Sequence, residues 1–197
     1  MKLAEGIKLI VGLGNIGNEY AETRHNVGFW YIDQIAQRHN TLFTEQKKFL
    51  GKTAKIRLNS DELILLKPST LMNRSGLSVV ALSHFYKLQP KQILVVHDDL
   101  DLMPGVKKFR LGGGTGGHNG LKSITQQLGS SDYYRLRFGI GHPRSLNLQI
   151  QVADFVLSSP NKEDRSKIDD CIDSSLTVID DLSKGNFDLV FQQVNTK

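Results

Sequence analysis

The sequence predicts an α/β fold, a single-domain sandwich in which helices flank a twisted, mixed and mostly parallel sheet. The first observation is that short apolar runs, typical of buried strands, alternate along the chain with segments of helical spacing. The second is a pair of candidate strands at 52–58 and 62–67, which are close enough in sequence to pair as a hairpin. No repeat or linker divides the 197 residues, so we expect one domain over 1–197.

The elements of the first half of the chain follow from the spacing of its apolar residues. A short continuous run that ends in glycine or proline predicts a buried strand, whereas apolar residues three or four positions apart predict a helix. In chain order we expect a strand at 7–13, a helix at 26–39, paired strands at 52–58 and 62–67 with a turn at 59–61, and a helix at 75–87.

The second half continues the alternation and ends in an acidic tail. In chain order we expect an apolar strand at 92–97, a polar loop at 98–105, a basic strand at 106–111, a glycine run at 112–117, a helix at 118–128 and a strand at 134–140. From Asn161 onward, apolar residues recur at helical spacing. We therefore expect the tail to be largely helical.

The charge of the chain is unevenly distributed. The net charge is +5, but residues 1–150 hold 20 basic and 11 acidic side chains, a balance of +9. Residues 151–197 hold 5 basic and 9 acidic side chains, a balance of −4. The basic part suits a polyanionic partner such as a nucleic acid, although a solvated basic surface has the same composition.

The single cysteine and the hydropathy pattern bear on the compartment. Cys171 has no partner for an internal disulfide, and no Cys/His cluster has zinc spacing, which favours a reducing environment. The apolar run at 7–13 is too short for a signal core or a membrane span. We expect a cytoplasmic protein that does not enter a membrane.

A glycine pattern near the start of the chain raises one alternative. Residues 12–17 read Gly-Leu-Gly-Asn-Ile-Gly, which matches the dinucleotide-binding pattern G-x-G-x-x-G after a strand. The full fingerprint also needs a second strand ending in an acidic residue about 20 positions on. Here Asp33 lies inside the predicted helix instead, so a dinucleotide-dependent oxidoreductase is a minor hypothesis.

Five motifs, in order, carry a family resemblance. They include Thr-Arg-His-Asn at 23–26 and Gly-Gly-His-Asn-Gly-Leu at 116–121, and the five together lie within 12–26, 67–76, 96–101, 112–121 and 137–143. The chain resembles the bacterial-type peptidyl-tRNA hydrolases. The resemblance implies a monomeric enzyme without metal or other cofactor. It also implies that the enzyme cuts the ester bond between the peptide and the 3′ end of N-blocked peptidyl-tRNA, which recycles tRNA from aborted translation.

The residue types leave water as the attacking group. The chain lacks a Gly-x-Ser-x-Gly elbow, and Cys171 lies in the acidic tail, where a core thiol is the better interpretation. A histidine with a pKa of about 6.5 can take a proton at neutral pH. For an isolated histidine at this position, capping or packing at the start of the following helix is the better interpretation, but the proton acceptor of the resembled family falls on His25.

Further side chains would support this base. Asp98 ends an apolar strand, where a carboxylate can face a site at the carboxyl edge of the sheet, so it could accept the ring proton of His25 and favour the imidazolium. The resemblance implies that Asn15 helps to distinguish N-blocked peptidyl-tRNA from free aminoacyl-tRNA, and amide side chains supply a donor and an acceptor without charge. The positions that match substrate contacts are Tyr20, Leu71, Asn73 and Asn119.

Basic residues around the glycine run are candidates for binding tRNA phosphates. They are Lys107, Lys108, Arg110, Arg137 and Arg144, each of which taken singly is also typical of a solvated surface. A divalent metal held by His97, Asp98, Asp99 and Asp101 is an alternative use of the acidic loop. We expect no metal, because Asp98 and Asp99 point oppositely if the strand continues through them.

Three positions depart from the pattern of the resembled family. Ile16 stands where proline is usual, which affects the turn before Tyr20. Leu71 stands where an aromatic residue is common, so an aromatic side chain is not available there to stack on the substrate. Asp99 stands where glutamate is common. A non-catalytic RNA-binding module remains a third hypothesis, since it would share the basic charge but cleave no ester.

Overall fold

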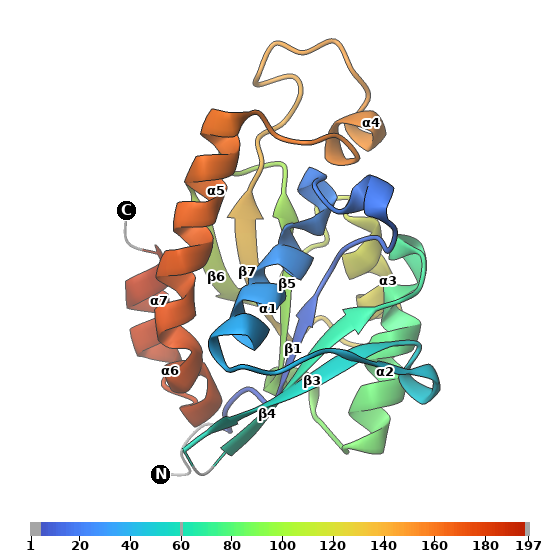
Figure 1. Cartoon of the computed structure of the whole chain (residues 1–197), viewed down its shortest axis with the longest axis vertical. Coiled ribbons are helices and arrows are strands. Elements are labelled where there is room, and N and C mark those ends of the chain that lie inside the picture. The colour runs from blue at the N-terminus through green and yellow to red at the C-terminus, as the bar shows by residue number, and fades with distance from the viewer. Residues whose placement is uncertain (1–4, 60, 196–197) are drawn as a thin grey trace.

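The computed structural model describes residues 5–59 and 61–195, in which helices cover both faces of one central sheet (Figure 1). The strands are β1 (Leu9–Gly12), β2 (Thr44–Gln46), β3 (Gly51–Leu58), β4 (Asp61–Pro68), β5 (Ile93–Asp99), β6 (Lys107–Leu111) and β7 (Tyr134–Gly139). The helices are α1 (Val27–Arg38), α2 (Ser75–Phe85), α3 (Asn119–Leu128), α4 (Val152–Val156), α5 (Lys162–Ser175), α6 (Ile179–Lys184) and α7 (Phe187–Asn195). The α/β class expected from the sequence is confirmed.

The sheet is mixed, with the strand order β2-β3-β4-β1-β5-β7-β6. Strands β4, β1, β5 and β7 are parallel neighbours at its centre, whereas β2, β3 and β6 extend it by antiparallel pairing. Five of the seven strands therefore run in one direction, and only β3 and β6 oppose them. The predicted hairpin is the β3–β4 pair, and its turn includes residue 60, which lies outside the described residues.

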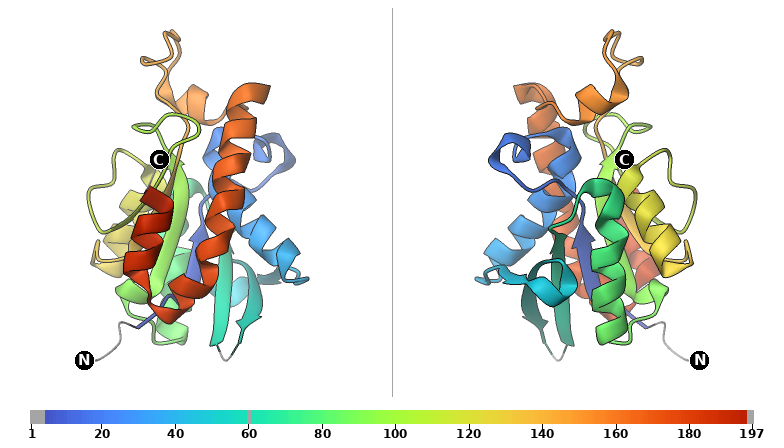
Figure 2. Two further views of the ribbon diagram at one scale, coloured as in Figure 1. Left: turned by 90° about the vertical axis from the view of Figure 1, so that its left-hand side faces the viewer. Right: turned by 90° about the vertical axis from the view of Figure 1, so that its right-hand side faces the viewer.

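Helices lie against both faces of the sheet (Figure 2), and a layer of buried apolar side chains holds them on each face. Ile10 of β1 and Leu94 of β5 lie in a core with α1, α5, α6 and α7. Their neighbours Leu9 and Ile93 lie in a second core with α2 and α3. The alternation of faces along each strand explains why both central strands are continuous apolar runs.

The glycines that mimic a dinucleotide motif serve close packing instead. A side chain at Gly12 would collide with the backbone of Gly28 in α1, and a Cβ at Gly14 would lie 2.6 Å from the Phe29 ring. The strand that follows α1 in sequence is β2, an edge strand that pairs with β3 and not with β1. The second strand of a dinucleotide-binding unit is therefore not beside β1, which counts against the oxidoreductase hypothesis.

The structure adds detail in three places that the sequence pattern does not predict. Strand β5 continues through Asp98 and Asp99, where the sequence pattern predicts a loop. The short elements β2 and α4 were not expected. The helical tail is broken into three helices, because a 3₁₀ turn at Leu176–Val178 and Gly185, with φ of 77°, interrupt it.

Over residues 5–59 and 61–195, no helix combines the length and the apolar character that spanning a membrane requires. Cys171 is free and buried against the sheet, as a core thiol should be, and burial raises its pKa.

Candidate active site

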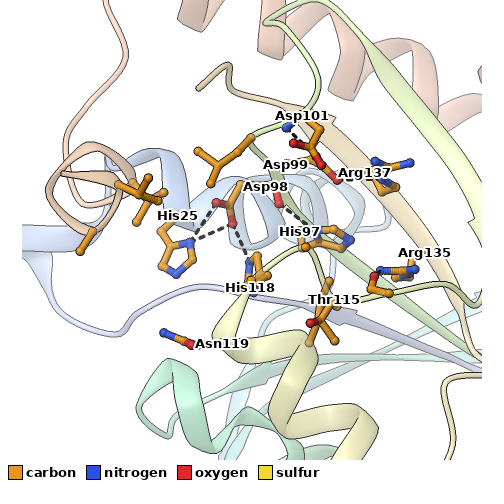
Figure 3. Close-up of a pocket in the computed structure, with 18 of the residues that line it drawn as sticks. His25, His97, Asp98, Asp99, Asp101, Thr115, His118, Asn119, Arg135 and Arg137 are labelled. Atoms are coloured by element: carbon orange, nitrogen blue, oxygen red, sulfur yellow. Dashed lines mark hydrogen bonds and ion pairs between the residues drawn. The ribbon is translucent and has the colours of Figure 1, made fainter. Parts of the chain in front are cut away.

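The candidate site lies at the carboxyl ends of the central parallel strands, where open α/β sheets commonly bind ligands. Asp98 is the penultimate residue of β5, and Asn15 follows β1. His25 lies in the 3₁₀ turn that precedes α1, and Asn119 is the first residue of α3. The topology thus brings residues from four separate segments to one edge of the sheet, and Figure 3 shows three of them, His25, Asp98 and Asn119.

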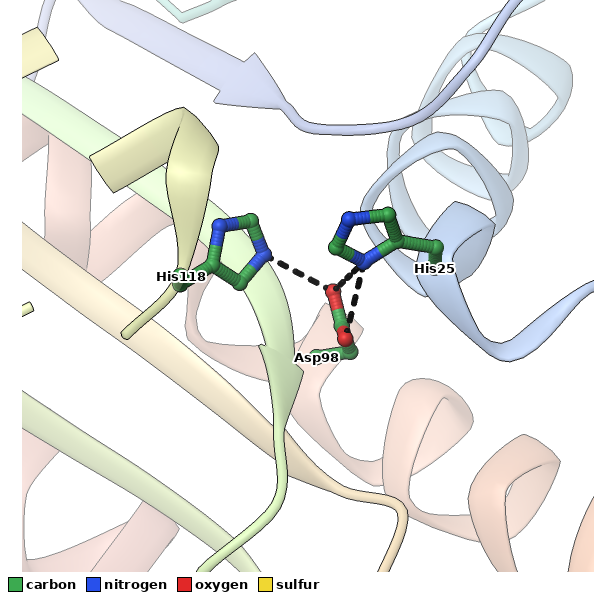
Figure 4. A group of neighbouring side chains, drawn as sticks. All are labelled: His25, Asp98 and His118. Atoms are coloured by element: carbon green, nitrogen blue, oxygen red, sulfur yellow. Dashed lines mark hydrogen bonds and ion pairs between the residues drawn. The ribbon is translucent and has the colours of Figure 1, made fainter. Parts of the chain in front are cut away.

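Two imidazoles face one carboxylate at the centre of the site (Figure 4). The Nδ1 atom of His25 lies 2.9 Å from Oδ1 and 3.0 Å from Oδ2 of Asp98. The Nε2 atom of His118 lies 2.9 Å from Oδ1 of the same residue. Asp98 is only 3% exposed, whereas 12% of the His25 side chain remains accessible. The carboxylate is therefore held from two sides, and His25 forms the boundary with solvent.

The hydrogen bonds assign the protons on both rings. The carboxylate accepts from Nδ1 of His25, which leaves the lone pair on its Nε2 atom free to take a proton. The Nδ1 atom of His118 accepts from the backbone N–H of Gly120 at 3.1 Å. Its proton must therefore be on Nε2, the atom that donates to Asp98.

Electrostatics favour an ionised carboxylate beside a basic imidazole. Burial alone would raise the pKa of Asp98, but His25 and His118 hold it well below its usual value. Burial lowers the pKa of His25, and the charge and hydrogen bond of Asp98 more than offset this, so that the net shift is upward. Burial lowers the pKa of His97 to about 3, so this ring is neutral and its Nδ1–H donates to the carbonyl of Asp98.

A groove of about 360 Å³ opens in front of His25. Its lining includes every residue that the sequence analysis assigns to substrate contact, together with Asn15. These residues are Asn15, Tyr20, Leu71, Asn73 and Asn119. Ile16 and Leu71, two of the departures noted in the sequence, lie in its wall with 51% and 70% of their surface exposed. The groove therefore offers amide groups near the histidine and apolar contacts further along.

A second cavity, of about 380 Å³, adjoins the groove on the other side of His25. Its lining includes Arg110, Arg135, Arg137 and the loop 114–117. Both cavities also share Asn119 and two residues of α4, so the site is continuous beneath this short helix. The result is one hollow with an amide-lined side and an arginine-lined side.

Arg135 holds the glycine loop in place through hydrogen bonds to its backbone carbonyls. The residue is 3% exposed, and its guanidinium donates to the carbonyl of Gly112 and, at 2.7 Å, to that of Gly114. Gly113 has a φ of 98°, a conformation that favours glycine. The loop is therefore fixed by a buried cation, which gives it a structural role in forming the cavity wall.

The five basic residues selected from the sequence do not form one cluster. Arg110 and Arg137 line the second cavity, where Arg137 pairs with Asp99 at 2.7 Å. The amine of Lys107 contacts Ser174 of α5, and that of Lys108 donates to the carbonyl of Asn195 of α7 at 3.1 Å. Arg144 is exposed in the loop after β7 and lines neither cavity.

Neither of two candidate ligand sets within the described part of the chain fits a metal centre. The set His97, Asp98, Asp99 and Asp101 does not converge, because Asp98 faces His25 while Asp99 bonds to Arg137. The trio of His25, Asp98 and His118 has ligand atoms within 4.8 Å of one another. However, His118 accepts a backbone N–H on Nδ1, so its Nε2 atom carries a proton and has no lone pair for a cation.

Comparisons with known proteins identify the family. A family model described as peptidyl-tRNA hydrolase matches residues 9–197. Among the relatives, peptidyl-tRNA hydrolase from Neisseria meningitidis serogroup C is 50% identical over 99% of this chain and 100% of its own length. The Bordetella avium protein of the same name is 50% identical over 98% of this chain and 94% of its own.

The chain belongs to the peptidyl-tRNA hydrolase family.

Structural similarity extends to a solved peptidyl-tRNA hydrolase. The crystal structure of that enzyme from Acinetobacter baumannii superposes with a TM-score of 0.91 and 42% identity, covering 96% of this chain and 95% of the other. The family expected from five motifs is thereby confirmed over almost the whole chain. The acidic tail, whose sequence was less distinctive, is included in the match.

Three residues of the candidate site are not predicted from the sequence. His118 lies within a quoted motif, but its contact with Asp98 joins residues 20 positions apart. Asn26 adjoins His25, and its amide bonds to the backbone of Asn15. Arg135 was not singled out at all. Asn26 and His118 lie within the quoted motifs, whereas Arg135 lies outside them, and the contacts of all three depend on the fold.

Proposed function

We propose that this peptidyl-tRNA hydrolase cleaves the ester between the peptide and the tRNA 3′ end with water activated by His25. The observation that carries the proposal is the hydrogen bond from Nδ1 of His25 to the buried carboxylate of Asp98 at 2.9 Å. That bond leaves Nε2 as the basic atom of the ring at the junction of the two cavities. No metal is involved, and residues 1–197 act as one domain.

The reaction follows from the positions of these groups. Water attacks the ester carbonyl carbon, and its proton passes to Nε2 of His25 as the new C–O bond forms. The carboxylate of Asp98 stabilises the imidazolium, which then returns the proton to the 3′ oxygen of the tRNA as the ester bond breaks. The products are a free peptide and a free tRNA, and His25 is again neutral.

The amide groups of the groove account for binding and for stabilising charge. Asn119 lines both cavities beside His25, so its side chain is placed to donate to the developing oxyanion. Asn15 and Asn73 are placed to hold the peptide carbonyl and the blocked amino group. Tyr20 and Leu71 contribute contacts with the remaining acyl and terminal-nucleotide surface.

The basic side of the site suits the acceptor end of the tRNA. Arg110 and Arg137 lie in the cavity on the far side of His25 from the groove, where a phosphate would meet guanidinium groups. Arg144, Lys107 and Lys108 extend the same basic half of the chain as outer contacts. A monomer in the cytoplasm that returns tRNA from aborted translation is consistent with this arrangement.

The test is direct. The purified protein is incubated in chelator with an N-acetylated aminoacyl-tRNA, and the release of free tRNA is followed alongside the unblocked aminoacyl-tRNA. The proposal expects rapid release from the blocked substrate only. Binding without release would instead support a non-catalytic RNA-binding module, and a thermal shift with NAD would support the oxidoreductase hypothesis.

A further inference from the structure

His118 is placed to do more than begin a helix. Its ring connects two parts of the site, since Nε2 donates to Asp98 at 2.9 Å and Nδ1 accepts the backbone N–H of Gly120 at 3.1 Å. The residue is the N-cap of α3, and the next residue in the chain is Asn119. One ring therefore contacts both the carboxylate behind the base and the helix that carries an amide of the groove (Figure 4).

The carboxylate depends on this contact for its orientation. Among the described residues, the side chain of Asp98 accepts hydrogen bonds from His25 and His118 only. The bond from His25 is shared between both oxygens, at 2.9 and 3.0 Å, and the terminal torsion of an aspartate is soft. A second donor on Oδ1, itself fixed by a helix terminus, removes that freedom.

We propose that His118 is a positioning residue of the hydrolytic reaction, which holds Asp98 in the orientation that keeps His25 in its Nδ1–H tautomer. The inference rests on the proposed role of His25. The same ring sets the start of α3, and so keeps Asn119 in register with the base. His118 contributes through these two residues and takes no proton itself.

The hydrogen bonds argue against a direct role for His118 as a second base. Both ring nitrogens are occupied, Nδ1 by a donor and Nε2 by an acceptor, so the ring has no free lone pair for a substrate proton. Only 8% of its side chain is exposed. A merely structural cap is the remaining alternative, and it predicts that the bond to Asp98 is dispensable.

Two substitutions separate the bond to the carboxylate from the cap. The amide of His118→Asn reaches the position of Nδ1, so it can still accept the Gly120 N–H, and asparagine is a favoured N-cap. It leaves Asp98 without its second donor. The longer His118→Gln places an N–H near the position of Nε2 and restores that donor. His84→Asn, on the exposed surface of α2, is the matched control.

The experiment measures steady-state hydrolysis of N-acetylated aminoacyl-tRNA and the melting temperature of each variant. We expect kcat of His118→Asn to fall by about 10- to 100-fold with KM nearly unchanged, the scale of one hydrogen bond to a charged group. His118→Gln should recover much of the loss, and both variants should melt close to the wild type. Equal kcat in His118→Asn and wild type, or equal losses in both variants, would overturn the proposal.

Nitrogen-15 spectra of the histidine rings give a second readout that needs no substrate. In the wild type we expect His118 with its proton on Nε2 and His25 with its proton on Nδ1. In His118→Asn, His25 should become a mixture of tautomers. A wild-type His118 protonated on Nδ1, or an unchanged His25 in the variant, would refute the inference. Absence of hydrolysis by the wild type would instead refute the proposed function.

Discussion

The side-chain amide of Asn26 closes a ring of hydrogen bonds with the backbone of Asn15. Its Oδ1 atom accepts the Asn15 N–H at 2.7 Å, and its Nδ2 atom donates to the Asn15 carbonyl at 2.9 Å. Asn26 is 2% exposed and adjoins His25 in the same 3₁₀ turn. The turn that carries the proposed base therefore also holds the loop that carries Asn15, so the two are positioned together.

Asn26→Asp tests this connection. The substitution keeps the size of the side chain but sets a carboxylate oxygen against the Asn15 carbonyl in place of a donor. We expect the free energy of unfolding to fall by about 1–3 kcal/mol, the scale for a disrupted buried hydrogen bond. Because Asn15 moves relative to His25, kcat/KM should also fall. Urea denaturation and steady-state kinetics measure the two effects, and an unchanged kcat/KM would show that Asn15 needs no such support.

The pH dependence of hydrolysis tests the role of Asp98. His25 acts as a base only when neutral, and its pKa is raised above the ordinary 6.5 because Asp98 outweighs burial. Hence kcat/KM should rise with pH and level off above an apparent pKa higher than 6.5. In Asp98→Asn the raising charge is lost while burial remains, so the rising limb should move to lower pH.

The plateau of Asp98→Asn should fall about 100-fold, since the base is no longer oriented. Asp173→Asn, on the exposed face of α5, is the matched control and should keep both the plateau and the apparent pKa. A limb that stays in place in Asp98→Asn would mean that another group controls the pH dependence.

Salt dependence of tRNA binding tests the arginine-lined cavity. If Arg110 contacts a phosphate, Arg110→Gln should weaken binding at low salt and reduce the slope of log K against log salt by about one unit. Lys91→Gln removes an equal charge just before the amino end of β5, whereas the site lies at the carboxyl end of that strand. This variant should leave the slope unchanged. Equal slopes for Arg110→Gln and wild type would remove this residue from the tRNA contact.

Close packing at the end of β1 predicts an effect on stability. A side chain at Gly28 would meet the backbone of Leu13 and Val96, which have little room to move. We expect Gly28→Ala to lower the free energy of unfolding by about 2–3 kcal/mol or more. Gly114→Ala is the comparison, because no atom beyond its own chain neighbours lies within 4 Å of the position that its methyl group would take, and it should change stability by less than about 0.5 kcal/mol. Similar denaturation curves for the two variants would contradict the packing account.

The sequence predicted most elements because their apolar spacing is regular. The continuous runs at β1 and β5 and the helical spacing of α1 each matched the structure within a few residues. The three-residue strand β2 is polar and exposed, so it has no apolar pattern to detect. The break before α7 depends on Gly185 adopting a positive φ, which a local pattern of hydrophobic residues does not specify.

The sequence indicates the candidate residues one by one, but not the network of contacts between them. Motif resemblance selected His25, Asp98 and the groove asparagines, and the fold places the asparagines beside His25 in one groove. The second hydrogen bond to Asp98 was not foreseen, because it comes from His118 at the N-terminus of α3, a separate segment of the chain. Lys107 and Lys108 looked equivalent to Arg110 in sequence, yet their amines contact the C-terminal helices.

The central claim is that Nε2 of His25 takes the proton from the attacking water. The most direct test is the single-turnover rate of ester cleavage by His25→Ala, measured with saturating enzyme in chelator, together with the tRNA affinity of the same variant. The account predicts that the rate falls by about 10²- to 10⁴-fold while affinity and melting temperature stay near those of the wild type. A near-normal rate in this folded variant would contradict it.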